Sequence, residues 1–467
     1  MNSKSLSRRS LLKRTACGFG SLAMAGLCQK ELSATPVVAT AGLHHRPKAK
    51  RVIFLFMQGG PSQVDSFDYK PALAKYADKK VEFHVARTMK ITPERVFPSP
   101  WKFSQYGRSG HWVSELFPSI AQHIDDICQL RGMHTEGVAH GPATLFLHTG
   151  ATNLIRPSVG SWITYGLGTE NQNLPGFITI CPTAAKGGPR NYSNGFLPSK
   201  FQGTAIGRAG VPVGQTAIRH VSNQRLSLAE QQKQLELLQA INRQQLSGSP
   251  DDDELEAAIG SFELAFRMQK HAPRVMDLSQ ETAAINSLYG IGEKETDDYG
   301  RQCLLARRFA EAGVRFIQVN YADNSNNPRW DQHSNLKKHE FHARAVDKPV
   351  AGLLQDLKTR GLLDDTLVWF GGEFGRTPFA QGNDGRDHNP KGFTVWLAGG
   401  GVQAGTSYGA TDEFGYTAVT DRVHMHDLHA TILHLLGIDH RQLTYRHAGR
   451  DFRLTDLYGR VVSEIFA

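Results

Sequence analysis

Short apolar runs that end in glycine or in polar residues recur along the chain. The run 366–370 consists only of β-branched, aliphatic and aromatic residues, which is typical of a strand buried on both faces of a sheet. Strands that alternate with helices predict an α/β fold with a mostly parallel central sheet and helices on both faces. The other strand-like runs lie at 51–57, 314–321 and 393–398, and segments with helical spacing lie at 301–313, 347–360 and 424–438.

Two further segments have helical patterns. Apolar residues from Leu116 to Ile127 are spaced for one face of a helix, so we predict a helix over 110–131. Residues 224–289 are rich in Gln, Leu, Glu and Ala with the same spacing, which is interrupted at 247–254. We predict two or more helices there that leave the sheet as an excursion. Their simplest role is a helical cover or a surface for a partner.

The N-terminus has the features of an export signal. Ser7–Lys13 matches the twin-arginine pattern, a mildly apolar stretch runs from Ala16 to Leu27, and Ala39–Ala41 offers a cleavage site. We predict a signal peptide at 1–41, a mature domain at 42–467 and a periplasmic or secreted location. The alternative is a basic N-terminus without a targeting role. No apolar run approaches the ~18 residues of a membrane span, so no integral membrane segment is expected after signal removal.

Charge and cysteine content exclude several classes of protein. The chain has 53 basic and 44 acidic residues, a formal charge of +9, and about five of these charges belong to residues 1–41. The net charge that remains is small, and no concentrated basic face is evident, which argues against a nucleic-acid binder. Cys128, Cys181 and Cys303 are widely spaced and form no Cys-x-x-Cys motif. We predict that these three are buried packing residues rather than disulfide partners.

Polar clusters directly follow several of the predicted strands. Ligands of α/β sheets bind beyond the carboxyl ends of the strands, and carboxylates, imidazoles and a guanidinium in that place suit a metal or an oxyanion. Three such clusters are the main sequence evidence for a site. They are Asp331 with His333, Glu373 with Arg376, and Asp387 with His388.

Histidines gather in two short stretches. His134, His140 and His148 lie close together beside glycines, which favours function for at least one of them, although a single histidine is more often structural. The predicted C-terminal helix carries His426, His429 and His434. Their spacing does not suit two ligands on one helix face, so we predict structural or supporting roles for them, with Asp427 at the helix start.

Six landmarks together resemble one family of exported proteins of unknown function, placed in the alkaline phosphatase/sulfatase-like superfamily. They are Gly59–Asp65, Arg156–Gly160, Trp330–His333, Gly372–Pro378, Gly385–His388 and Leu436–Asp439. The resemblance implies an alkaline-phosphatase-like fold with one or two divalent metal ions, commonly zinc, beyond the carboxyl edge of the sheet. It implies these roles: metal ligands at Asp331, His333, Glu373 and His388, a ligand or a partner of His388 at Asp387, and an oxyanion contact at Arg376.

Two positions depart from the superfamily pattern. Gln58 and two glycines stand after the first strand, where an acidic ligand is usual. His140 stands where a hydroxyl or modified cysteine nucleophile is expected, counting back from Thr149 and Gly150. Three interpretations remain open: His140 is the nucleophile or an acid/base, water attacks directly, or the site no longer hydrolyses a substrate.

The leading functional hypothesis is an exported, metal-dependent hydrolase of sulfate or phosphate esters. Its substrate would be a small molecule or a polysaccharide ester. The alternative is a catalytically silent metal- or carbohydrate-binding envelope protein on the same scaffold, and a third hypothesis is a structural envelope component whose polar clusters are caps and salt bridges. The sequence leaves the oligomeric state open.

Overall fold

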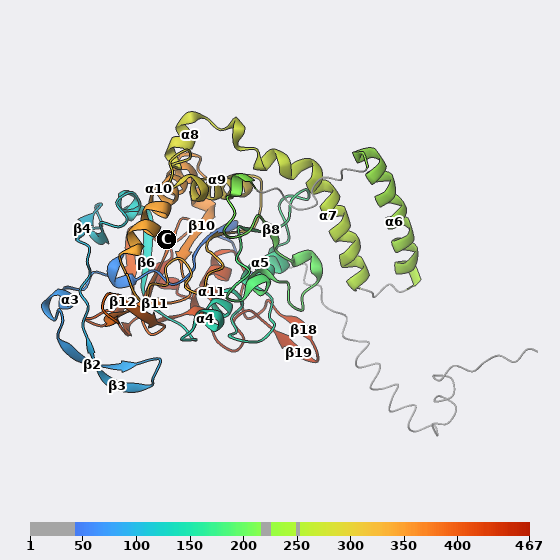
Figure 1. Cartoon of the computed structure of the whole chain (residues 1–467). Helices are drawn as coiled ribbons and strands as arrows, with labels where there is room; N and C mark the ends of the chain where they lie inside the picture. Colours follow the sequence, from blue (N-terminus) through green and yellow to red (C-terminus); the bar gives the residue numbers. More distant parts are fainter. Residues whose placement is uncertain (1–42, 216–225, 249–252) are drawn as a thin grey trace, which may run out of the picture. The chain divides into compact units, whose positions relative to one another are not determined.

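The run at 366–370 forms β10 (Thr366–Gly371) near the middle of a nine-stranded sheet, and every residue of this strand is buried. The computed structural model describes residues 43–215, 226–248 and 253–467. Gly42–Ala467 form one compact unit, whose strands and helices are shown in Figure 1. The predicted signal peptide at 1–41 lies outside the described residues.

Parallel pairing dominates the central sheet. Its order is β14 (Thr406–Tyr408), β6 (Ile127–His134), β13 (Phe393–Ala398), β10, β1 (Arg51–Met57), β9 (Phe316–Tyr321), β7 (Phe177–Ile180) and β8 (Thr204–Ile206), and β17 (Val423–His424) also pairs with β6. Of these nine described strands, only β13 runs antiparallel to its neighbours, β10 and β6. The predicted α/β class with a mostly parallel sheet is confirmed.

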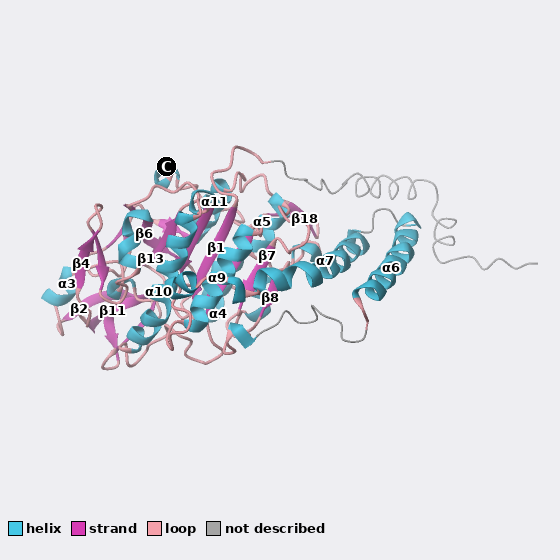
Figure 2. Cartoon of the chain, turned by 90° about the horizontal axis from the view of Figure 1, so that it is seen from above, coloured by secondary structure: helices cyan, strands magenta, loops and turns pink. Residues whose placement is uncertain are grey.

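Helices cover both faces of the sheet (Figure 2). The even-numbered residues from Val52 to Phe56 belong to a core that includes α5 (Val159–Leu167) and α11 (Met425–Leu435). The odd-numbered residues from Ile53 to Met57 belong to a separate core with α9 (Asp297–Glu311) and α10 (Lys338–Thr359). Successive side chains of a strand point to opposite faces, so a wholly apolar strand requires both layers.

The remaining helices and hairpins surround this three-layer body. The predicted excursion contains α6 (Leu228–Gly248), α7 (Asp253–Met276) and α8 (Ala283–Leu288), and α6 packs against α7. The other helices are α3 (Pro71–Lys75) and α4 (His140–Thr149). The small hairpins are β2–β3 (Lys80–Val85, Lys90–Arg95), β4–β5 (Phe103–Tyr106, His111–Ser114), β11–β12 (Gly375–Gln381, Gly385–Asn389), β15–β16 (Ala410–Thr411, Ala418–Thr420) and β18–β19 (Tyr445–His447, Arg450–Phe452). No described helix is both long and apolar enough to cross a membrane.

The predicted helix over 110–131 is wrong. This segment contains β5, a 3-10 helix at Ile120–Asp126 and the start of β6. The 3-10 helix buries Ile120 and Ile124, while Ile127 already belongs to the strand. The apolar spacing was therefore produced by two different elements. The three described cysteines are free and buried, as predicted.

Candidate metal centre

Parallel strands deliver the candidate residues to one edge of the sheet. Gly59 follows β1, Asp331 follows β9 and Glu373 follows β10, and these three strands are parallel neighbours. His140 follows β6 as the first residue of α4. Because the carboxyl ends of parallel strands share an edge, segments far apart in the sequence meet there.

Four side chains at this edge form a compact group: His140, Asp331, His333 and His388. One ligand atom from each lies within 4.8 Å of the others. The three imidazoles converge on Oδ1 of Asp331, which is 3.1 Å from Nε2 of His140, 2.9 Å from Nε2 of His333 and 3.3 Å from Nε2 of His388. We call this group the four-residue cluster.

Each imidazole of the cluster is held from outside through its other nitrogen. Nδ1 of His140 is 2.5 Å from Oε1 of Glu373, and Nδ1 of His388 is 2.7 Å from the main-chain oxygen of Val138. Nδ1 of His333 contacts Oε1 of Gln381. An outward partner on one ring nitrogen, with the other nitrogen turned inward, is the usual arrangement of histidines that bind metal.

The hydrogen-bonding roles of these partners favour a cation at the centre. A carboxylate and a main-chain carbonyl can only accept hydrogen bonds, so Nδ1 of both His140 and His388 carries a proton. A neutral ring then presents the lone pair of Nε2 to the carboxylate of Asp331, and this contact is repulsive unless a proton on Nε2 or a metal ion lies between them. Nε2 of His140 is buried 3.1 Å from Oδ1 of Asp331, which accepts from it only when both ring nitrogens carry a proton. Three imidazole nitrogens and one carboxylate oxygen suit a divalent metal.

Burial and charge set the protonation of the cluster. Burial raises the pKa of Asp331, but the contacts with the three histidines and the charge of Arg376 lower this pKa far below its ordinary value. Burial lowers the pKa of His388. Burial also lowers the pKa of His140, but Asp331 and Glu373 outweigh this effect and raise it. Asp331 is therefore ionised, and a proton and a metal compete for His140.

Glu373 lies behind His140 rather than in the cluster. Its side chain is fully buried, and both of its carboxylate oxygens accept from the main-chain nitrogen of Gly59, at 3.0 and 3.2 Å. Gly59 has φ +103, and a Cβ there would lie 2.4 Å from the oxygen of Pro328. The glycine at position 59 thus allows the close approach of the segment 328–331, which carries Asp331. The carboxylate of Glu373 orients His140, and its predicted role as a metal ligand is not apparent in these contacts.

Arg376 is fully buried beside Asp331. Nη2 donates to Oδ1 of Asp331 at 2.8 Å and to the oxygen of Gly59, while Nε donates to Gly60 at 3.1 Å and Nη1 to Arg386 at 3.2 Å, both through main-chain oxygens. These contacts hold the Asp331 carboxylate in place. To bind a substrate oxyanion, the role implied by the resemblance, the guanidinium would have to leave them.

Asp387 lies on the rim of the cluster. Its Oδ1 accepts from the main-chain nitrogen of His388 at 2.8 Å and is 3.8 Å from Nδ1 of His333. These contacts fit the predicted alternative that Asp387 positions a neighbouring histidine. Sequence reasoning did not identify Gln381, and its position at the end of β11 gives no motif that could have revealed it.

The other nearby polar side chains are committed to partners. Oε1 of Gln58 accepts from the main-chain nitrogen of Asp323 at 2.9 Å. Asp65 accepts from Nε and Nη2 of Arg386 at 2.7 and 3.0 Å, and both side chains of this pair are fully buried. Gln58 and Asp65 therefore do not add ligands for a further ion.

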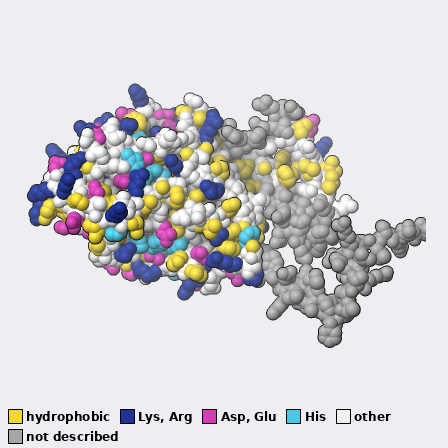
Figure 3. Space-filling view, turned by 60° about the horizontal axis from the view of Figure 1, so that its bottom comes forward, with side chains coloured by type: hydrophobic (Ala, Val, Ile, Leu, Met, Phe, Trp, Pro, Cys, Tyr) yellow, Lys and Arg dark blue, Asp and Glu magenta, His cyan; other side chains and the backbone are white. Residues whose placement is uncertain are grey.

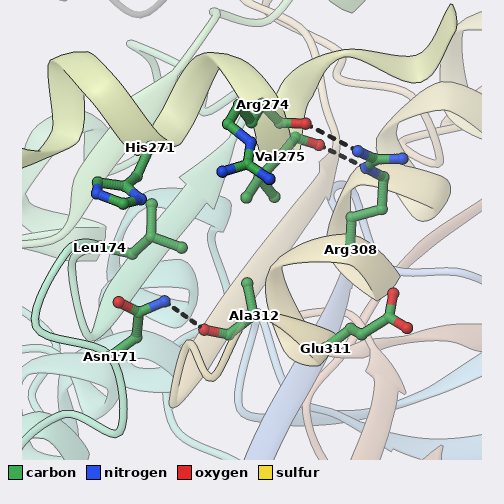
Figure 4. A pocket seen from close by; sticks show the side chains of 8 residues that line it. All are labelled: Asn171, Leu174, His271, Arg274, Val275, Arg308, Glu311 and Ala312. Carbon is green, nitrogen blue, oxygen red and sulfur yellow. Dashed lines mark hydrogen bonds between the residues drawn. The ribbon is translucent and has the colours of Figure 1, made fainter. Parts of the chain in front are cut away.

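A separate pocket of about 340 Å³ lies among the ends of α7 and α9 and the loop at 171–174. Figure 4 shows Arg308 donating to the main-chain oxygens of Arg274 and Val275, at 2.8 and 2.6 Å, and Asn171 donating to that of Ala312 at 2.7 Å. No residue of the four-residue cluster lines this pocket, so it is distinct from the candidate metal centre.

Solved structures that align with the chain include sulfatases and members of the alkaline phosphatase superfamily. The PsFucS1 sulfatase from Pseudoalteromonas sp. aligns at 11% identity and TM-score 0.36, over 84% of this chain and 68% of that chain. An alkaline phosphatase superfamily protein from Vibrio parahaemolyticus aligns at 10% identity and TM-score 0.36, over 91% and 72%. The alkaline phosphatase of the Antarctic bacterium TAB5 aligns at 10% identity and TM-score 0.33, over 83% and 98%. These scores are too low to support a conclusion about function.

No curated protein matches the sequence significantly. A family model does, and it covers nearly all of the compact unit. The chain belongs to the family described as "Protein of unknown function (DUF1501)", whose model matches residues 49–466.

Proposed function

We propose that this protein is an exported, metal-dependent hydrolase of phosphate or sulfate esters, acting in the periplasm or outside the cell after twin-arginine export. Its substrate is a small-molecule or polysaccharide ester. The observation that carries the proposal is the convergence of three imidazole Nε2 atoms on Oδ1 of Asp331, at 2.9 to 3.3 Å. The strand ends that assemble this cluster place it at the edge where α/β proteins bind their ligands.

The donor set favours one zinc ion. Three imidazole nitrogens and one carboxylate oxygen are ligands that zinc prefers, and a zinc ion can accept a further oxygen, such as that of an ester, as a fifth ligand. His140, Asp331, His333 and His388 would hold the ion, and Asp65 is paired with Arg386 and so does not offer a ligand to a second ion. When bound, a divalent cation supplies Lewis acidity, which polarises a phosphoryl or sulfuryl oxygen.

The surrounding residues hold the ligands rather than react. Arg376 donates to Asp331 at 2.8 Å and fixes the carboxylate. Glu373 accepts the Nδ1 proton of His140 and so keeps Nε2 of that ring directed inward. His140 has both ring nitrogens engaged when a metal is bound, which disfavours a nucleophilic role. The hydroxyl of Ser62 is buried and donates to Asp65, so we infer that a water molecule attacks the ester directly.

Elemental analysis of the folded, exported protein tests the proposal. We expect about one zinc per chain and cleavage of p-nitrophenyl phosphate or p-nitrophenyl sulfate that a chelator abolishes and zinc restores. His388→Ala should lose both metal and cleavage. The matched control is His111→Ala in the β4–β5 hairpin, where Nε2 lies 3.0 Å from the main-chain oxygen of Gly405, and it should keep both.

Two outcomes would contradict parts of the proposal. A metal-free protein, or a His388→Ala variant that retains its zinc, would refute the metal centre. Zinc bound without turnover of any phosphate or sulfate ester would refute the hydrolase and favour the silent metal- or carbohydrate-binding alternative.

A further inference from the structure

The arginines inside the site are not available to a substrate. Arg376 and Arg386 are fully buried and paired with Asp331 and Asp65. An ester whose free oxygens are negatively charged therefore needs another cationic side chain near the cluster. Among the described residues, Arg87 is the exposed arginine that contacts the rim of the cluster.

Arg87 lies in the turn between β2 and β3, and 61% of its side chain is exposed. Its Nη1 is 3.4 and 3.5 Å from the two carboxylate oxygens of Asp387. These distances are longer than the 2.7–2.9 Å of a strong charge-assisted hydrogen bond. Asp387 in turn contacts His333 and His388. The guanidinium thus lies beside the cluster in a weak contact that a competing anion can replace.

The turn that carries Arg87 is anchored to the rest of the protein. The main-chain nitrogen of Ala86 donates to the hydroxyl of Tyr416 at 2.8 Å, and Nζ of Lys391 donates to the oxygen of His84 at 2.6 Å. A small core joins β2 and Val96, the residue after β3, to Phe379 of β11. The same β11–β12 hairpin carries Arg376 and His388, and Figures 1 and 2 both show β2 beside β11. The position of Arg87 relative to the cluster is therefore built into the fold.

The segment around Arg87 is basic. Residues 75–95 contain six Lys or Arg residues and three Asp or Glu residues. Figure 3 shows Lys and Arg side chains gathered at the end of the molecule that carries α3, β2 and β3 in Figure 1. Clustered positive charge beside a site raises the local concentration of anions and speeds their association.

We propose that Arg87 binds the anionic oxygens of the substrate, releasing Asp387, so that the site selects phosphate or sulfate monoesters over neutral esters. This inference rests on the proposed function. The planar guanidinium can donate two parallel hydrogen bonds to a phosphate or sulfate group. Arg87 is thereby a substrate-binding residue, while Arg376 remains the residue that holds Asp331.

Calorimetric titration of the zinc-loaded full chain with inorganic phosphate and with inorganic sulfate tests this role. We expect Arg87→Gln to weaken binding of the preferred anion by about ten- to hundredfold at unchanged zinc content, with a similar fall in kcat/KM for the matching p-nitrophenyl monoester. Hydrolysis of p-nitrophenyl acetate, a neutral ester, should not fall with it. Arg87→Lys should restore binding only in part, because an ammonium cannot donate in the bidentate geometry.

Arg95→Gln is the matched control, because Arg95 lies in the same hairpin and pairs with Asp78 at 2.7 Å. It should change anion binding by less than about twofold. Equal losses in the two variants would show a general charge effect and overturn the proposal, as would a wild-type protein that binds neither anion. Anion binding that depends on Arg87, without turnover in the wild type, would support Arg87 and refute the hydrolase.

Discussion

This protein contains two groups of three histidines whose ring nitrogens contact different kinds of atom. The three of the four-residue cluster turn Nε2 toward one carboxylate oxygen, at 2.9 to 3.3 Å. The other group, which we call the packing histidines, consists of His148, His426 and His429. Each of these has one ring nitrogen within 2.8 to 3.0 Å of a main-chain oxygen, and none of them belongs to a candidate metal group among the described residues.

The two groups differ because the histidines of the four-residue cluster share one carboxylate, that of Asp331, and the packing histidines do not. Burial lowers the pKa of His148 to about 4 and that of His429 to about 3, and the charge of Glu373 offsets this effect only in part at His148. The packing histidines therefore remain neutral and join helices. His426 and His429 of α11 contact the oxygens of Gly150 and Leu147 at the end of α4. They thus help to hold the helix whose first residue is His140.

Asp331→Asn should give the largest effect on zinc affinity, since it removes the anion that distinguishes the two groups. Three imidazoles would then face a neutral amide, and we expect zinc affinity to fall by more than about a hundredfold, beyond the range typical of residues that only orient a ligand. Competition with a fluorescent chelator measures this change. Asp387→Asn is the comparison, because Asp387 only positions the neighbouring histidines, and it should lower affinity by no more than about tenfold, the lower end of the range for residues that orient a ligand. Equal losses in the two variants would mean that Asp387 is also a ligand.

His429→Ala should produce the opposite pattern. The side chain is fully buried and bonded to Leu147, so its removal leaves a cavity and an unpaired carbonyl. We expect the free energy of unfolding to fall by about 2–4 kcal/mol with zinc affinity unchanged. His388→Ala should lose zinc while the metal-free protein changes by less than about 1 kcal/mol. Chemical unfolding of the metal-free proteins measures this, and variants that lose stability and zinc together would erase the distinction between the groups.

Glu373→Gln should have an intermediate effect on metal binding. The amide keeps the shape of the side chain but weakens the partner of His140 Nδ1, and residues that orient a metal ligand typically contribute about ten- to hundredfold in affinity. The same chelator competition measures this change. A loss as large as that of Asp331→Asn would restore Glu373 to the ligand role that the sequence predicted. No loss at all would mean that His140 is oriented by other contacts.

The sequence predicted four strands of the sheet, β1, β9, β10 and β13, because the relevant signal is local. β1 and β10 are short runs that are apolar apart from Arg51 and Thr366 at their starts, and each is wholly buried. The segment 110–131 was mispredicted because its apolar spacing is shared by a 3-10 helix and a strand, which only tertiary packing separates. In the same way, β13 has the composition of its neighbours, so its reversed direction leaves no trace in the residues.

The candidate site was predictable in its position but less so in the role of each residue. Asp331 follows the predicted strand at 314–321, and His388 precedes the predicted strand at 393–398. These placements bring both residues to one edge of the sheet. Whether a side chain at that edge points toward the metal centre depends on its contacts with residues that are distant in the sequence. His140 faces the centre because Glu373 holds its other nitrogen. Arg87 reaches the rim from a separate hairpin, and no local pattern indicates such a contact.

The smallest expected effect is the acid sensitivity of the packing histidines. His429 has a pKa near 6.5 in an unfolded chain and about 3 in the folded protein, where His424, His426 and His148 surround it and it contacts the oxygen of Leu147. Between these two values the unfolded chain binds more protons. Stability from the neutral ring is therefore complete above about pH 6.5 and falls as the pH drops, by up to about 1.4 kcal/mol per pH unit.

Replacing His429 with Gln removes this titration while keeping a polar side chain. Urea unfolding of the metal-free wild type and of His429→Gln at about pH 7, 6 and 5 should therefore give a shallower pH dependence in the variant. The cluster histidines titrate in both proteins, so they cancel from the difference between the slopes. Parallel slopes would mean that His429 has the same pKa in the folded and in the unfolded chain. Burial would then not hold this ring neutral, and the contrast between the two groups would no longer rest on charge.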